Sequence, residues 1–306
     1  MHSMIHPYAS KSFAETLFHM GRPVEVPEWG SCVIARPIVG GGNDVIGCYP
    51  LSIINSDADF NAGLARLRAE GFVSATLILD DFHRPPVEVL ERSLDLVRPF
   101  KTHFLHRGPL GNYKPGKDHR YKINRACRTV TTRPIDLAEH IDDWIALYDG
   151  LTDRHGLSGM HVFPRRSYEM LALLPGIHTI GGFIDEKLVA CHIWVMHAGR
   201  VHSHLTASNA QGYTNRAAYA VSDASIKYFA DAEIINFGGG AGLGNDPGDG
   251  LVQFKRGFSN DQAQSYICGA VLDRTAYSAL SGRQDVAANE YFPAYRNPVQ
   301  TAQATA

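Results

Sequence analysis

Residues 234–258 read IINFGGGAGLGNDPGDGLVQFKRGF, and this is the most distinctive stretch of the chain. It predicts a short strand over 233–238, a glycine-rich loop, and a segment, LVQFKRGFS, that leads into a further strand over 264–272. The loop has neither the GxGxxG spacing of dinucleotide-binding folds nor the Gly-Lys-Ser/Thr ending of a P-loop. Its glycines, Gly239 and Gly240 among them, either let the backbone approach a ligand or only tolerate positive φ angles, and both interpretations stay open.

Upstream of this stretch the sequence predicts helices and then a meander of strands. Helices are expected over 136–156 and 166–174, and in the first of them apolar residues recur at helical spacing. Three strand-like runs follow, separated by turns at 185–186 and 198–199. A helix over 215–232 then connects the meander to the distinctive stretch.

The first third of the chain has a mixed α/β pattern. Strands are predicted over 31–39 and 73–80, on either side of a helix over 59–71 that either Asp57 or Asp59 can cap.

Two more helices are expected before a boundary at Arg133-Pro134. The first covers 86–99, and the second is a strongly basic helix over 116–129. Apolar residues define one face of the first and a thin stripe on the second: Val87, Leu90, Leu94 and Val97, then Tyr121, Ile123 and Ala126.

The distinctive stretch resembles the C-terminal lobe of the FemABX and GNAT-like acyltransferases, in which a strand and a glycine-rich turn precede an F-K-x-G-F segment. The resemblance extends more weakly over 202–234, and the basic run HRYKINRACR resembles the Arg- and Lys-rich helix between the lobes of that family. It implies an α/β (α+β) fold of two GNAT-like lobes, each a mixed, largely antiparallel sheet flanked by helices, with a substrate cleft between them. The predicted domains are 1–132 and 133–286, followed by a partly disordered tail, 287–306.

The family's Phe-Lys pair falls on Phe254 and Lys255, which the resemblance makes the predicted catalytic residues. Attack of an amine on an ester or thioester builds negative charge on the carbonyl oxygen, and a fixed cation stabilises that transition state more than the ground state. Phe254 would limit water around Lys255 and strengthen this interaction. The alternative is that Lys255 is a solvated surface charge at the start of a strand.

The segment before the 215–232 helix bears on the acyl donor. GNAT enzymes that use acetyl-CoA usually carry Q/R-x-x-G-x-G/A there, whereas residues 209–214 read NAQGYT and keep only the central glycine. This departure argues against CoA, and the alternative is that the segment holds the acceptor. The helix start favours an anion, to which Arg216 would add a bidentate contact, but ordinary capping accounts for it equally well. The predicted substrate-binding residues are Tyr213, Asn215, Arg216, Gly239, Gly240 and His204.

The basic helix is the one local excess of positive charge, because the formal net charge of the chain is only -2. Its side chains would contact a polyanion such as a tRNA acceptor stem, a diphosphate-linked sugar or an acidic partner. The alternative is a solvated helix face. The predicted polyanion-binding residues are Lys117, Arg120, Lys122 and Arg125.

Histidines raise the question of a metal. His202 and His204 lie two apart on one expected strand, and His192 lies on its neighbour, so three imidazoles could converge. No carboxylate has ligand-like spacing, and we therefore expect no metal. One histidine could instead act as a base toward the amine, and Asp80 and Asp81, at a strand end, are further candidates.

Composition excludes several classes of protein. No stretch approaches the roughly 20 apolar residues of a membrane span, and the N-terminus has no secretory signal pattern. A cytoplasmic location is therefore expected. The five cysteines lack CxxC spacing, which favours reduced, mostly buried thiols over a disulfide framework or a zinc site.

Together these observations predict an acyltransferase that forms an amide bond by transferring an aminoacyl or acyl group from an activated donor to an amine acceptor. The acceptor would be a small molecule, a peptide or a sugar. Aminoacyl-tRNA is favoured slightly as the donor over acyl-CoA, and no tightly bound cofactor is expected. A further alternative is a ligand-binding protein that keeps the fold without catalysis.

Overall fold

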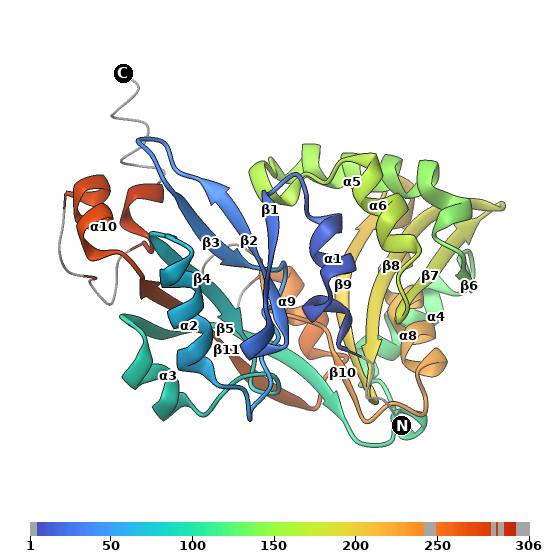
Figure 1. Ribbon diagram of the computed structural model, residues 1–306. Helices are drawn as coiled ribbons and strands as arrows, with labels where there is room; N and C mark the ends of the chain where they lie inside the picture. The colour runs from blue at the N-terminus through green and yellow to red at the C-terminus, as the bar shows by residue number, and fades with distance from the viewer. Residues whose placement is uncertain (1–4, 242–248, 283–285, 287–290, 298–306) are drawn as a thin grey trace. The chain divides into compact units, whose positions relative to one another are not determined.

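The structure is a computed structural model, and it describes all residues except 1–4, 242–248, 283–285, 287–290 and 298–306 (Figure 1). The chain forms two compact units: unit 1 comprises residues 1–100 and 264–306, and unit 2 comprises residues 101–263.

The units divide the chain at different places from the predicted domains. Residues 101–132 belong to unit 2, and residues 264–286 belong to unit 1. The C-terminal segment returns to unit 1 because Tyr266–Val271 pairs with the strand Ser74–Leu79.

Unit 1 has a mixed sheet in which β1, β2 and β3 are antiparallel neighbours, β4 runs parallel to β3, and β11 runs antiparallel to β4. The strands are β1 (Arg22–Val26), β2 (Ser31–Pro37), β3 (Asn43–Gly47), β4 (Ser74–Leu79) and β11 (Asp261–Val271), the last of which begins in unit 2. The helices are α1 (Lys11–Thr16), α2 (Phe60–Ala69), α3 (Val87–Ser93) and α10 (Arg274–Ser281), with short 3-10 turns at Pro7–Ala9, Pro27–Trp29 and Ala294–Arg296.

Unit 2 has a mixed sheet in the order β5-β10-β9-β8-β7-β6, in which only β10 and β9 are parallel. The strands are β5 (Leu96–Arg107), which begins in unit 1, β6 (Thr131–Ile135), β7 (Ile177–Ile184), β8 (Lys187–His197), β9 (Arg200–Ser208) and β10 (Ile234–Asn236). The helices are α4 (Lys117–Ala126), α5 (Ile141–His155), α6 (Arg165–Ala172), α7 (Ala210–Thr214), α8 (Ala217–Tyr228) and α9 (Gly250–Arg256), with 3-10 turns at Leu110–Asn112, Ala138–His140 and Gly159–His161.

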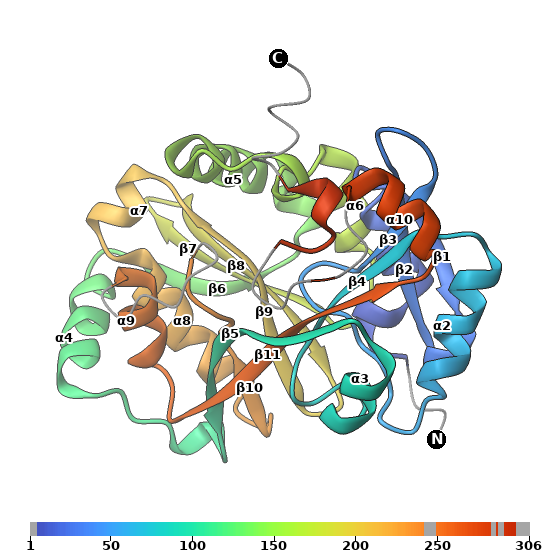
Figure 2. The same cartoon turned by 90° about the vertical axis from the view of Figure 1, so that its left-hand side faces the viewer.

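Helices cover both faces of the unit 2 sheet. α8 packs on β6, β7 and β8 and contacts α4, whereas α5 packs on β8 and β9. Figures 1 and 2 show α5 and α6 on one face of this sheet and α4 and α8 on the other. The predicted α/β fold of two lobes, each a mixed, largely antiparallel sheet flanked by helices, is confirmed.

The predicted meander is confirmed as β7, β8 and β9. Its turns are tight because Asp185 (φ 48°), Glu186 (φ 59°), Ala198 (φ 46°) and Gly199 (φ 75°) all adopt positive φ angles. Paired positive φ values are those of the two-residue hairpin turns whose twist matches that of the strands.

Two of the predicted boundaries were wrong. The helix expected over 86–99 ends at Ser93, because Leu94 is extended (φ -121°, ψ 152°) and β5 begins at Leu96. The boundary expected at Arg133-Pro134 lies inside β6 instead. β6 is the last strand in the unit 2 sheet order, and an edge position tolerates proline.

The cores of the two units each contain a tryptophan that makes a hydrogen bond. In unit 1, Trp29 stacks on Phe60 at 5.3 Å between ring centroids and donates Nε1–H to the Phe60 carbonyl at 3.0 Å. In unit 2, Trp194 donates to Ser225 Oγ at 3.0 Å. All five cysteines are free thiols, and only Cys127 is exposed, as the composition predicts.

The structure decides which aspartate caps α2. Asp59 Oδ1 accepts a hydrogen bond from the Ala62 amide at 2.9 Å, whereas Asp57 is exposed before the helix. Asp59→Ala is therefore expected to lower the free energy of unfolding by about 1 kcal/mol. The matched control Asp57→Ala should change it by less than about 0.5 kcal/mol. Urea denaturation followed by circular dichroism measures both, and equal effects would contradict this assignment.

Candidate functional site

Lys255 lies on α9, in unit 2, which ends at Arg256, so that only the first three residues of the FKRGF segment are helical. Asp249 begins this helix, because its Oδ1 accepts the Leu251 amide at 2.9 Å. Its Oδ2 accepts the Ala241 amide at 3.3 Å and so also holds the glycine-rich loop. The alternative that placed this lysine at the start of a strand is wrong, because Lys255 is in the last turn of a capped helix.

The side chain of Lys255 turns back onto the glycine-rich loop and is half-buried. Its Nζ donates to the Gly239 carbonyl at 2.6 Å. Burial and, to a smaller extent, the neighbouring Lys101 lower the pKa of Lys255 to about 7, and Asp249 opposes the shift. Lys255 is therefore a cation close to its point of titration at neutral pH.

A second lysine, Lys101 on β5, reaches the same loop. Its Nζ donates to the Gly240 carbonyl at 3.0 Å, and burial lowers its pKa. Lys101 was not predicted from the sequence, because the strand that carries it was not predicted. Gly239 and Gly240, which were predicted to bind substrate, hold the two lysine amines through their carbonyls.

Phe254 of α9 belongs to a cluster of aromatic side chains to which α4 and α8 also contribute. Its ring lies edge-on to Tyr219 of α8, with centroids 4.8 Å apart, and also contacts Phe258 at 5.1 Å. His119 of α4 completes the cluster and donates Nε2–H to the Phe254 carbonyl at 2.9 Å. The cluster thus fixes the backbone next to Lys255, and the role of Phe254 in limiting water there stays a prediction.

Two histidines of the meander, His192 and His204, are uncharged at neutral pH. Burial, and then Lys255, hold the pKa of His192 well below its ordinary value, and burial lowers that of His204 to about 3. His192 Nε2 contacts Ser203 Oγ at 2.8 Å, and its ring stacks on Trp194 at 3.7 Å. A register shift between β8 and β9 places Ser203 opposite Trp194.

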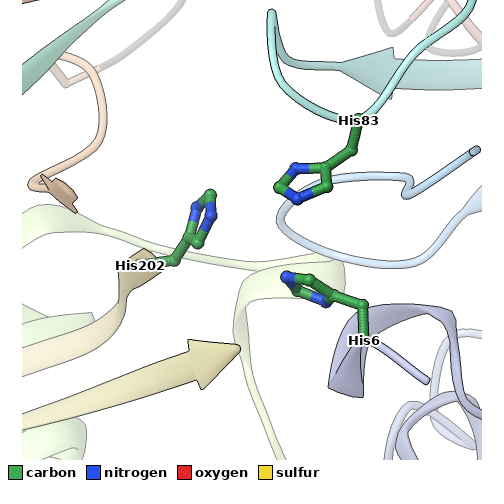
Figure 3. A group of neighbouring side chains, drawn as sticks. All are labelled: His6, His83 and His202. Atoms are coloured by element: carbon green, nitrogen blue, oxygen red, sulfur yellow. The ribbon is translucent and has the colours of Figure 1, made fainter. Parts of the chain in front are cut away.

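His83 of unit 1 lies beside a carboxylate. Asp80 accepts the amides of Phe82 (3.0 Å) and His83 (2.9 Å), and its Oδ1 lies 3.2 Å from His83 Nδ1. Figure 3 shows the rings of His6 and His83 turned toward each other, with centroids 5.0 Å apart, and also labels His202 of β9. The carboxylate predicted as a possible base therefore stabilises a turn and orients His83.

The residues predicted at the helix start after 209–214 are exposed or half-buried around α7. Asn209 accepts the Gly212 amide at 2.9 Å and so begins α7, which means that α8 starts at Ala217 and not at Asn215. Arg216 has a positive φ of 57° between the two helices. A Cβ on Gly212 would lie 2.3 Å from the Val189 carbonyl oxygen, so only glycine fits there.

Tyr213 and Asn215 also make polar contacts with side chains of other segments. Arg154 of α5 lies over the ring of Tyr213 at 4.2 Å, and Asn215 Oδ1 accepts a hydrogen bond from Thr129 Oγ1 at 3.1 Å. None of the interactions described for Tyr213, Asn215 or Arg216 involves Lys255. Their role in substrate binding stays a prediction.

The basic helix α4 presents its charges to solvent. Lys117, Arg120 and Arg125 are exposed, whereas Lys122 is half-buried, pairs with Asp118 at 2.7 Å and lies over a tyrosine ring. The predicted apolar stripe was wrong in one position. Tyr121 is 61% exposed, and the buried residues are His119, Ile123 and Ala126.

Comparison with solved structures identifies the fold. FemX superposes with a TM-score of 0.63 at 12% identity, covering 90% of this chain and 95% of FemX. The C-terminal domain assigned to lysylphosphatidylglycerol synthetase from Agrobacterium fabrum gives 0.60 at 13% identity, covering 85% of this chain and 87% of that domain. The chain has a FemABX-like fold. The resemblance predicted from the FKRGF stretch is thereby confirmed.

A further solved structure shares this fold, whereas the comparisons with family models and curated proteins found no match. L-PGS from Bacillus licheniformis gives a TM-score of 0.56 at 12% identity, covering 88% of this chain and 94% of that one. No protein-family model and no curated protein matches the sequence. At such low identities the shared FemABX-like fold does not by itself transfer an activity.

Among the described helices, none is both long enough and apolar enough to cross a membrane.

Proposed function

We propose that this protein is an acyltransferase that forms an amide bond, with Lys255 facing the carbonyl oxygen of an activated acyl donor. The observation that carries the proposal is the position of the Lys255 amine. Lys255 is half-buried on a capped helix, and its amine donates a hydrogen bond to the Gly239 carbonyl. The FemABX-like fold supports it, because FemX and L-PGS share that fold at matching length.

The chemistry follows from the charge on Lys255. The amine nitrogen of the acceptor attacks the acyl carbon, a C–N bond forms, and the carbonyl oxygen becomes an oxyanion that the ammonium stabilises. The C–O bond of an ester, or the C–S bond of a thioester, then breaks, and the proton lost by the attacking amine is taken up by the departing oxygen or sulfur, so that an amide and an alcohol or thiol are formed. Because the ammonium is already fixed by a carbonyl, little reorganisation is needed when the negative charge develops.

We favour an aminoacyl-tRNA donor for two reasons. The segment that would bind the pyrophosphate of CoA forms α7, where the Gly212 amide is already bonded to Asn209. The exposed face of α4 offers Lys117, Arg120 and Arg125 to a polyanion. A cytoplasmic location belongs to the same proposal, because tRNA is charged in that compartment. An acyl-CoA donor is the second candidate.

The donor is tested by supplying each class directly. The purified chain is incubated with candidate amines and either radiolabelled aminoacyl-tRNA or acyl-CoA thioesters, with and without ribonuclease, and amide products are counted. We expect products from charged tRNA that disappear with ribonuclease. Products that survive ribonuclease and require the thioester would exclude the tRNA donor, and no product from either class would contradict the proposal.

A further inference from the structure

A serine and a histidine form a hydrogen-bonded pair on neighbouring strands of the meander. Ser203 of β9 lies opposite Trp194 of β8, because one extra residue in β9 shifts the register at this point. Residues opposite each other, and residues two apart along a strand, point to the same face of a sheet. Ser203, Trp194 and His192 therefore share one face, and His192 Nε2 lies 2.8 Å from Ser203 Oγ.

The same face of the sheet carries the helices α8 and α9. Trp194 donates a hydrogen bond to Ser225 of α8, and α9 packs against α8 through Phe254. The amine of Lys255 on α9 is close enough to His192 to lower the pKa of that imidazole. The serine-histidine pair and the lysine of the candidate site therefore belong to one region of unit 2.

Ser203 also lies where the parallel strands β9 and β10 separate. Their pairing ends at His202 and Asn236, so Ser203 is the next residue of β9, and the glycine-rich loop follows β10. Asn236 Oδ1 accepts the Gly238 amide at 2.8 Å, and a Cβ on Gly238 would lie 3.4 Å from Lys255 Nζ. The loop that holds the Lys255 amine thus begins beside Ser203.

The imidazole of His192 is held in one orientation, while Ser203 stays partly accessible. His192 is 5% exposed and stacks on the buried ring of Trp194, whereas Ser203 is half-buried. Burial and Lys255 both hold the pKa of His192 well below its ordinary value, so an imidazolium would be unfavourable there. His192 is therefore unsuited to take the proton from Ser203 that an acyl-serine mechanism requires.

We propose that the hydroxyl of Ser203 carries the proton of the attacking amine to the departing oxygen of the acyl donor, and that His192 positions this hydroxyl. This inference rests on the proposed function, since it names the residue that moves the proton in that reaction. A serine hydroxyl has one donor proton and two acceptor lone pairs. His192 Nε2–H donates to one lone pair, the amine donates to the other, and the hydroxyl donates to the departing oxygen.

The proton transfer leaves the charge of both residues unchanged. As the C–N bond forms and the C–O bond breaks, the amine proton passes to Ser203 Oγ while the original hydroxyl proton passes to the departing oxygen. The hydroxyl is restored, and His192 stays neutral, which avoids a second cation beside Lys255. An alcohol is a much weaker acid than a thiol, so the departing oxygen of an ester needs this proton more than the sulfur of a thioester does.

The first test needs no acyl donor. The full chain is labelled with ¹⁵N at histidine, and the chemical shifts of the two ring nitrogens show which of them carries the proton. We expect the His192 signals, assigned by their loss in His192→Gln, to show a protonated Nε2 and an unprotonated Nδ1 at pH 7. An unprotonated Nε2 would make Ser203 the donor to His192 and would overturn the inference.

The second test measures kcat and KM with whichever donor gives product in the ribonuclease assay. Ser203→Ala should lower kcat by about 10²-fold with little change in KM, as loss of a positioned proton-transfer group does. Thr206→Ala removes an exposed hydroxyl from the same strand and should turn over as the unaltered chain does. His192→Phe should lower kcat similarly, whereas His192→Gln should retain most of it, because its amide N–H can replace Nε2–H.

A better leaving group distinguishes proton transfer from a structural role. The p-nitrophenyl ester of the same acyl group releases an anion that needs no proton, so Ser203→Ala should lose much less activity with it. Equal losses with both donors, or a Ser203→Ala chain as active as Thr206→Ala, would overturn the inference. An acyl group found on Ser203 by mass spectrometry after incubation with donor alone would overturn it as well. An unaltered chain that turns over no donor would instead refute the proposed function, whatever tautomer His192 adopts.

Discussion

Replacing Lys255 with methionine is expected to lower kcat for acyl transfer by about 10²–10³-fold, the usual cost of removing one group that stabilises an oxyanion. Methionine keeps most of the side-chain volume, so α9 should stay folded while the cation is lost. The measurement is turnover with whichever donor gives product in the ribonuclease assay, together with the circular dichroism spectrum of the variant. A Lys255→Met chain that turns over at the original rate would show that Lys255 does not stabilise the oxyanion, whereas an unaltered chain that turns over no donor would favour a binding protein without catalysis.

The pH dependence of the rate distinguishes the effect of the charge of Lys255 from the effect of its packing. The pKa of Lys255 is about 7, so the ammonium predominates below pH 7 and the neutral amine above it. The contribution of this cation to the rate is therefore present at low pH and is lost as the pH rises through about 7. Lys255→Arg stays charged, so any activity it retains should lack this decline. A decline that persists in Lys255→Arg would assign it to another group.

Local patterns in the sequence were sufficient to predict elements whose determinants lie within them. α2 has an aspartate cap at Asp59, and the meander has turn residues at 185–186 that adopt the required positive φ angles. The stretch 234–258 predicted the fold class through its resemblance to the FemABX and GNAT-like acyltransferases, because it combines a strand, a glycine-rich turn and the F-K-x-G-F segment.

Features that depend on distant residues were not predictable in this way. Lys101 lies on β5, whose start continues the apolar spacing of the preceding helix, so the periodicity of Val87, Leu90, Leu94 and Val97 extended the predicted helix into the strand. β5 is extended because it pairs with β10, which lies far along the chain. No local pattern shows that Lys101 meets the loop of Gly240. The second lysine of the site therefore required the tertiary structure.

Gly257, the glycine of the FKRGF segment, directly follows α9. We expect one added methyl group to disturb α9 most at this position. A Cβ on Gly257 would lie 1.9–2.3 Å from three atoms of the His119 ring. That ring cannot move away freely, because His119 is only 8% exposed and donates to the Phe254 carbonyl. Gly257→Ala is expected to lower the free energy of unfolding by about 1–3 kcal/mol, as overpacking in cores does. It should also lower turnover, because α9 must shift and carries Lys255 with it.

A matched substitution on the same helix controls for the change in backbone entropy. A Cβ on Gly250, at the start of α9, would meet no atom within 4 Å, so Gly250→Ala should leave both stability and turnover nearly unchanged. Adding His119→Ala to Gly257→Ala frees the space of the ring and should recover part of the lost stability, which makes the two effects non-additive. Urea denaturation of the four chains measures this coupling. If Gly257→Ala proves as stable as Gly250→Ala, the His119 ring is not the reason that position 257 requires glycine. If the coupling is present, the glycine of the motif is required because α4, which carries the basic face, packs directly against the helix that carries Lys255.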